Sequence, residues 1–264
     1  MIATNPTQFP ELNAVLEDLV ENAKRILGDN FFGAYLVGSF AVGDADIHSD
    51  CDFLIVVNDP LTPKQEASLR KLHNEIPTRP EHWAKHLEGS YTLKNDLGTL
   101  DALGQDWLYI DHGHREMERS PHCNSLEHRW SLHECGIVLS GPDPKTFTAK
   151  VPPEAIRENM HKSVQSFLED LESWISLEGI AWAQRYAVTT LCRILYSMET
   201  GNIASKKESL LWATSHLDQK WSGLIHKAME GRSLGFNPDE LPSPEDVDAT
   251  RAFIEYAKDR AISL

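Results

Sequence analysis

Hydrophobic residues recur every three to four positions near the start of the chain, which predicts an amphipathic helix over residues 10–28. Gly28 is suited to end this helix, because glycine readily adopts the backbone conformations that stop one. One face of the helix should therefore be buried. Its predicted apolar stripe consists of Leu12, Val15, Leu16, Leu19, Val20, Ala23 and Leu27.

Three short segments after this helix have the pattern of strands. Residues 33–38 and 52–57 are apolar runs rich in Val, Ile and Tyr, which is typical of buried strands, and residues 86–93 alternate polar and apolar side chains. Between the second and third segments a helix is predicted from Thr62 to about Asn74, because Thr caps helices and Pro63 fits the first helical position.

The pattern then becomes irregular over residues 96–144, apart from apolar stretches at 107–110 and 136–140, and residues 140–153 concentrate Pro and Gly as a linker does. Beyond Pro153 every segment has helical periodicity. We therefore predict an α+β protein with a mixed-sheet domain over residues 1–150 and an all-helical domain over residues 151–264. The predicted helices of the second domain are residues 154–177, 181–200, 205–217, 218–231 and 243–261.

Composition and charge exclude several classes of protein. With 41% hydrophobic residues in 264, the chain can build a sizeable core, but no apolar run approaches the roughly 20 residues of a membrane helix. The N-terminus lacks the order of a signal peptide, and the four cysteines form no C-x-x-C pair, so we expect a cytoplasmic protein with reduced thiols. The net charge of -15 argues against nucleic acid as a partner and suits a cationic small molecule, although acidity is also an ordinary means of staying soluble.

Candidate chemistry is concentrated in residues 38–57. Asp50 and Asp52 stand at the entrance to a predicted strand, and because strand side chains alternate, both point to the same face. Two close carboxylates repel each other unless a cation lies between them, and Mg²⁺ prefers such oxygen ligands together with phosphates. Gly38 and Ser39 offer a close backbone approach, an N–H group and a hydroxyl to phosphate oxygens, helped by the N-terminus of a following helix. The alternative is a surface turn that caps the strand.

The order Gly-Ser, ten residues, Asp-x-Asp and an apolar strand resembles the signature of the nucleotidyltransferase superfamily related to DNA polymerase β. Members of that superfamily add a third carboxylate from a later strand, which binds the metals and in some branches acts as general base. Glu88 is the candidate here, and the alternative for it is an exposed strand glutamate. The resemblance implies attack of a hydroxyl on the α-phosphorus of a nucleoside triphosphate, with pyrophosphate leaving.

Residues 191–213 resemble the helical domain of bacterial aminoglycoside adenylyltransferases of the streptomycin and spectinomycin 3''(9) type. In that family a helix containing Ala-Arg-Ile leads to a Thr-Gly turn and then to Ser-Lys. The resemblance implies that Arg193 and Lys206 hold the triphosphate of ATP. On the residues alone, an arginine paired with an acid and a surface lysine are the alternatives.

The acceptor residues rest on the same resemblance. Family members stack the drug on tryptophans, and Trp130 and Trp174 fall where those occur, although by spacing alone each is typical of a core residue. Streptomycin-modifying members use an acidic residue shortly after the second tryptophan. Counting back from Arg193 puts Gly179 at that position with Glu178 beside it, which argues against streptomycin as the substrate.

Several histidines and Cys123 lie close together in residues 112–133, but they lack zinc-ligand spacing, so a solvated loop is the prediction there. Hydrolase, dinucleotide-binding and P-loop motifs are absent. The sequence thus predicts an adenylyltransferase, a monomer or weak oligomer, that uses ATP and Mg²⁺ to move AMP onto an aminoglycoside-like cation. A nucleotidyltransferase with a protein or other non-drug acceptor and a non-catalytic nucleotide-binding module are the alternatives.

Overall fold

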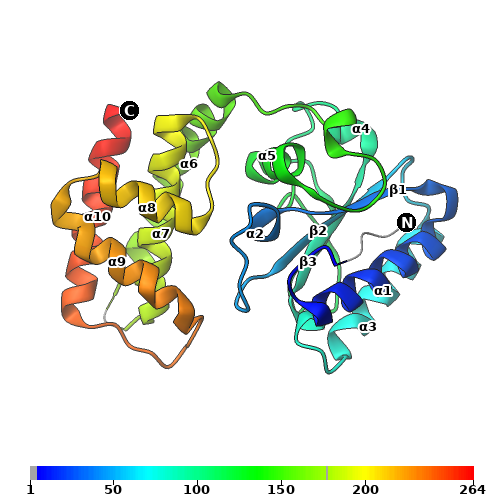
Figure 1. Cartoon of the computed structure of the whole chain (residues 1–264), viewed down its shortest axis with the longest axis horizontal. Helices are drawn as coiled ribbons and strands as arrows, with labels where there is room; N and C mark the ends of the chain where they lie inside the picture. Colours follow the sequence, from blue (N-terminus) through cyan, green and yellow to red (C-terminus); the bar gives the residue numbers. More distant parts are fainter. Residues whose placement is uncertain (1–4, 177) are drawn as a thin grey trace. The chain divides into compact units, whose positions relative to one another are not determined.

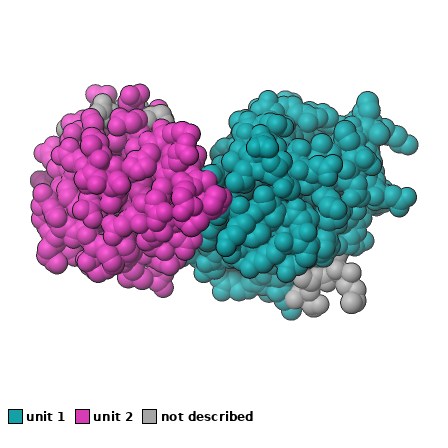
Figure 2. Space-filling view, turned by 90° about the horizontal axis from the view of Figure 1, so that it is seen from above, with its two compact units in different colours: residues 1–151 teal, residues 152–264 magenta. Residues whose placement is uncertain are grey.

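The computed structural model describes residues 5–176 and 178–264. The chain divides into two compact units, Met1–Val151 and Pro152–Leu264 (Figure 2). Among the described residues, no helix is both long enough and apolar enough to cross a membrane.

The first unit is built on a mixed sheet, in which Figure 1 labels β1, β2 and β3. The order of its six strands is β5-β4-β3-β2-β1-β6. Only β2 and β3 among these neighbours pair in parallel, and the other pairs are antiparallel. The strands are β1 (Phe31–Leu36), β2 (Cys51–Val57), β3 (Leu87–Leu93), β4 (Trp107–Ile110), β5 (Glu118–Ser120) and β6 (Ile137–Ser140). The helices are α1 (Pro10–Leu27), α2 (Gly38–Ala41), α3 (Pro63–Glu75), α4 (Lys94–Leu97) and α5 (Leu126–Cys135).

Helix α1 confirms the predicted amphipathic stripe, because the seven apolar residues named for it are its buried residues, and Gly28 follows with a positive φ of 57°. Its apolar face packs with α3 on one face of the sheet, and the core there includes Phe53 and Ile55 of β2. Leu132 of α5 belongs to a smaller core on the opposite face. Helix α3 begins with the predicted cap, in which Thr62 and Gln65 form a complete capping box.

The structure corrects two predictions in this unit and decides an alternative in a third. The first strand ends at Leu36, and Gly38 begins the short helix α2 instead of ending a strand. The strand predicted over residues 86–93 is present as β3, and both of its faces are buried, which excludes the alternative of an exposed strand glutamate at Glu88. Residues 112–133 are not one solvated loop, because they include β5 and most of α5.

The second unit is helical, as predicted. Its central helix, α7, packs against α6, α8, α9 and α10. The predicted helix over residues 154–177 ends at Trp174, and Leu177 lies outside the described residues. Ser243 accepts the N–H of Asp246 and so caps the last helix in the predicted way. The helices are α6 (Pro153–Trp174), α7 (Ala181–Thr200), α8 (Lys206–His216), α9 (Ser222–Glu230) and α10 (Pro244–Ser263).

Candidate active site

Three carboxylates meet where the two parallel strands of the first unit begin. Asp52 of β2 is in register with Glu88 of β3, and neighbouring residues in register point to the same face of a sheet. Asp50 lies two residues before Asp52, so strand alternation directs it to that side as well. The parallel pairing therefore brings Glu88 to the two aspartates, 36 and 38 residues away in the chain.

Electrostatic repulsion is built into this arrangement. Burial raises the pKa of Asp50, and the negative charges of Glu88 and Asp52 raise it further, against the effect of His112. Negative neighbours disfavour the ionised form of such a carboxylate, and a cation placed among the carboxylates stabilises that form. The site thus favours a positively charged partner.

Glu88 is nearly buried and firmly held. Its Oε1 atom accepts a hydrogen bond of 2.8 Å from the hydroxyl of Tyr109 and lies 2.9 Å from Nε2 of His122. Burial by itself raises the pKa of Glu88, but the hydrogen bonds from His122 and Tyr109 hold it below the usual value of a glutamate. The hydrogen bond between His122 and Glu88 in turn raises the pKa of the His122 imidazole. Glu88 is therefore an ionised carboxylate, and its Oε1 is engaged by two donors.

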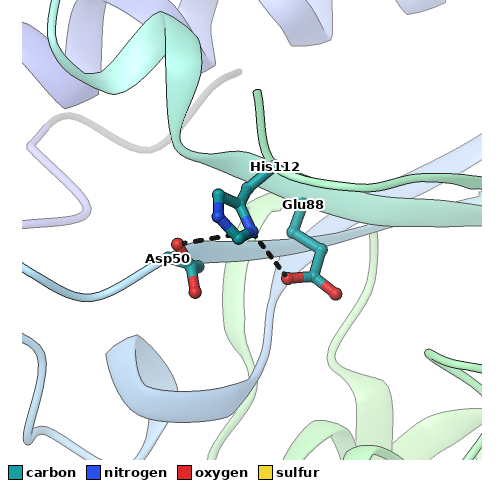
Figure 3. Close-up of side chains that lie close together, drawn as sticks. All are labelled: Asp50, Glu88 and His112. Atoms are coloured by element: carbon teal, nitrogen blue, oxygen red, sulfur yellow. Dashed lines mark ion pairs between the residues drawn. The ribbon is translucent and has the colours of Figure 1, made fainter. Parts of the chain in front are cut away.

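Histidines surround the carboxylates on several sides. Nδ1 of His112 lies 3.8 Å from Oδ1 of Asp50 and 3.9 Å from Oε2 of Glu88 (Figure 3). Nε2 of His128 lies 3.9 Å from Oδ1 of Asp52. This finding corrects the prediction that the histidine-rich segment is only solvated, because these imidazoles face the carboxylates.

Sequence reasoning missed Tyr109, His112 and His122 as parts of the site. Tyr109 lies in the apolar stretch that was recognised as strand-like, but only its pairing with β3 shows that its hydroxyl reaches Glu88. The usable signal was the density of histidines directly after that stretch. The histidines lack the regular spacing of metal ligands along the chain, because the pairing of the strands, and not one helix or turn, sets the positions of their rings.

Gly38 has a role that differs from the predicted one. Its φ is +60°, and a Cβ atom at this position would lie 2.1 Å from Oδ2 of Asp52, so only glycine fits without displacing that carboxylate. Its N–H donates to Oγ of Ser131 at 3.0 Å. The close backbone approach therefore serves Asp52, and the N–H predicted to face phosphate is bonded to α5.

The residues present fit a divalent cation. Asp50, Glu88 and His112 each offer one donor atom, and these atoms all lie within 4.8 Å of one another. Ligand atoms around one ion lie roughly 3 to 4 Å apart when each is about 2.1 Å from the metal, so the separations of 3.8 and 3.9 Å are compatible with a shared ion. Asp52 is outside this group of three, although its charge acts on Asp50.

The other candidate residues occupy several elements. Trp130 is half-buried in α5 of the first unit, whereas Trp174 ends α6 of the second. Trp174 is 45% exposed, with its ring 6.0 Å from that of Tyr186, which corrects the expectation that spacing makes it a core residue. Glu178 is exposed in the turn before α7.

Arg193 and Lys206 lie on neighbouring helices of the second unit. Arg193 is a half-buried residue of α7, and Lys206 is the exposed first residue of α8, directly after the capping Ser205. A cavity of about 440 Å³ between α7, α9 and α10 is lined by other residues, among them Gln184, Leu224 and Thr250. The predicted triphosphate residues are thus separate from this cavity.

Comparisons with known proteins cover both units. A nucleotidyltransferase domain model matches residues 17–88, and a model of the C-terminal domain of aminoglycoside adenylyltransferases matches residues 147–260. Over 223 residues the chain is 25% identical to a spectinomycin 9-adenylyltransferase of Staphylococcus aureus, with 79% of this chain and 80% of the relative covered. It is 26% identical over 261 residues to an aminoglycoside (3'') (9) adenylyltransferase of Escherichia coli, with 94% of each covered.

A solved structure has the same fold. It is a spectinomycin adenyltransferase from Enterococcus faecialis, determined with ATP and spectinomycin. The TM-score is 0.61 at 18% sequence identity, and the match covers 94% of this chain and 98% of that one. The shared fold therefore extends over nearly the whole length of both chains.

Proposed function

The chain belongs to the aminoglycoside adenylyltransferase family and is a nucleotidyltransferase, and we propose that it moves AMP from ATP onto a hydroxyl of an aminoglycoside-like cation. Pyrophosphate is the second product. The observation that carries the proposal is the meeting of Asp50, Asp52 and Glu88 at the start of two parallel strands. A protein that only bound nucleotide would have no need of the third, firmly held carboxylate.

Glu88 is the proposed general base. Tyr109 and His122 hold Oε1, so the carboxylate has one orientation, and Oε2 is the oxygen on the side of His112 and Asp50. An ionised carboxylate can accept the proton of the acceptor hydroxyl as that oxygen attacks the α-phosphorus. The lowered pKa of Glu88 keeps it ionised near neutral pH, at the cost of some basicity.

Asp50, Asp52 and Glu88 are the residues proposed to hold Mg²⁺. When bound, the ion supplies charge neutralisation for the phosphate oxygens of ATP. The hydroxyl of Ser39, the residue after Gly38 in α2, is proposed to bind the phosphates together with Arg193 and Lys206. Cationic side chains suit this role because charge-assisted hydrogen bonds stabilise the negative charge that moves onto the leaving pyrophosphate.

The acceptor is proposed to be a cationic small molecule. A net charge of -15 attracts such a molecule, and the relatives are named for spectinomycin and aminoglycosides. Trp130, Trp174 and Glu178 are proposed to contact it, and the large exposed fraction of Trp174 supports its part. Because Gly179 has no acidic side chain, spectinomycin is proposed in preference to streptomycin.

The proposal is tested by pyrophosphate release from the purified chain with ATP, Mg²⁺ and a panel of aminoglycosides that includes spectinomycin and streptomycin. We expect release with spectinomycin and its loss in Asp52→Asn. Asp59→Asn is the matched control, because Asp59 is exposed just beyond the other end of β2.

Each outcome has a separate meaning. If no member of the panel gives release above background, the drug acceptor is wrong, and a screen for AMP added to proteins or other small molecules comes next. If Asp52→Asn turns over like the wild type, the carboxylate cluster is not the active site.

A further inference from the structure

The imidazole of His112 projects into the space between two of the acidic groups (Figure 3). Its Nδ1 atom is 3.8 Å from Asp50 and 3.9 Å from Glu88, and the three donor atoms lie within 4.8 Å of one another. One nitrogen thus faces two carboxylates, that of Asp50 just before β2 and that of Glu88 in β3. The Asp-x-Asp pattern and the strand glutamate do not account for this imidazole.

Sheet pairing explains why this histidine reaches the site. β4 runs antiparallel to β3, and its last residue, Ile110, pairs with Gly89. The chain that continues beyond Ile110 therefore passes Glu88 and approaches the start of β2. The backbone of His112 is held by the Asp111 side chain, which accepts its N–H at 2.8 Å, and the ring of His86 lies nearly parallel to the His112 ring with 6.2 Å between centroids.

The distances from Nδ1 of His112 to the surrounding carboxylates are longer than those of a hydrogen-bonded ion pair. Hydrogen bonds between charged nitrogen and oxygen atoms are about 2.7 to 2.9 Å long. Nδ1 of His112 is 3.3 Å from Asp111 and farther from Asp50 and Glu88. The nitrogen points toward several carboxylates without hydrogen bonding closely to one, as a ligand atom of a shared cation would.

We propose that His112 is a metal ligand alongside Asp50 and Glu88, which makes the site a mixed carboxylate and imidazole site that holds Mn²⁺ more tightly than Mg²⁺. The inference rests on the metal-binding part of the proposed function. Mg²⁺ prefers oxygen ligands almost without exception, whereas an imidazole nitrogen adds affinity for first-row transition ions. Carboxylates by themselves give some preference for Mn²⁺ over Mg²⁺. The His112 ring should increase that preference.

The test is electron spin echo spectroscopy of Mn²⁺ bound to the full chain, without nucleotide or acceptor. A directly bound imidazole couples its nitrogen nucleus to the electron spin of the ion. We expect this coupling in the wild type and its loss in His112→Asn. His114→Asn is the matched control, because His114 lies in the same loop, is 66% exposed and also faces Asp111, and it should keep the coupling.

Calorimetric titration gives the second measurement. His112→Asn should weaken Mn²⁺ binding by about tenfold, equal to 1.4 kcal/mol, while Mg²⁺ binding changes little. Circular dichroism confirms that both variants are folded. Wild-type protein that binds Mn²⁺ without nitrogen coupling, or that does not bind Mn²⁺, overturns the proposal, as does equal loss of coupling in both variants.

These results are separable from the proposed function. Pyrophosphate release with Mg²⁺ but no nitrogen coupling would remove His112 from the metal site and leave the adenylyl transfer intact. Nitrogen coupling without pyrophosphate release for any acceptor would support the ligand and count against the acceptor.

Discussion

A Cβ atom on Gly38 would lie 2.1 Å from Oδ2 of Asp52, so the backbone at Gly38 and the carboxylate of Asp52 occupy adjoining space that admits no side chain between them. Gly38 also has a positive φ, which side-chain-bearing residues adopt at a cost. The position of Asp52 thus depends on a glycine 14 residues earlier in the chain.

Gly38→Ala should consequently displace Asp52 and lower turnover by about a hundredfold or more, as a misplacement of about 1 Å does in other active sites. Gly43→Ala is the control, because Gly43 also has a positive φ but a Cβ there would meet nothing within 4 Å. Both variants should lose about 1 kcal/mol of stability from backbone strain. Steady-state kinetics and urea unfolding separate the two effects, and equal turnover in both variants would contradict the prediction.

Glu88→Gln should retain ATP binding and lose turnover by about 10² to 10⁴, as expected when a general base is removed. Tyr109→Phe removes one donor to Oε1 and leaves the carboxylate in place, so we expect a smaller loss. ATP affinity and single-turnover rates are the measurements. Unchanged turnover in Glu88→Gln would remove Glu88 from the chemistry.

Lys206→Ala should weaken ATP binding by roughly ten- to a hundredfold, because a hydrogen bond to a charged group contributes about 1.5 to 3 kcal/mol. Lys207→Ala is closely matched, since Lys207 is the next residue of α8 and is also exposed. Calorimetry with ATP compares the two variants. If both lose affinity equally, the effect is one of general charge and not of a contact made by Lys206.

His73 should make the protein less stable in mild acid. It is buried between Phe53 and Tyr91, and burial lowers its pKa to about 3. An unfolded histidine has a pKa of about 6.5, so between the two values the unfolded chain binds a proton that the folded chain does not. Stability therefore rises with pH in this window and is lost as the pH falls below about 6.5.

The size of this effect can be measured by urea unfolding. Between pH 7 and pH 5 the contribution of His73 amounts to about 2 kcal/mol. His73→Gln should show a pH dependence smaller by that amount, because glutamine can hydrogen bond to Tyr91 without titrating. His48→Gln, at an exposed position, should behave like the wild type, and parallel curves for all three proteins would exclude His73 as the cause.

Local patterns in the sequence were sufficient for most of the secondary structure. Apolar residues recur with the period of a helix over residues 10–27, and these residues are the ones buried in α1. Helix α7 has the predicted limits, residues 181–200. A helix of this length shows its periodicity clearly in the sequence. The short elements α4 and β5 were not predicted, since three or four residues are too few to show a period.

The sequence by itself also identified two acidic residues of the candidate site, because Asp50 and Asp52 are two positions apart and the strand that begins between them sets their common direction. Only the tertiary structure decided what surrounds them. Tyr109, His112 and His122 approach Glu88 from β4 and the loops beyond it, and the N–H of Gly38 finds its partner 93 residues away in Ser131. Such contacts depend on which strands pair and in which direction, and spacing along the chain carries no record of that pairing.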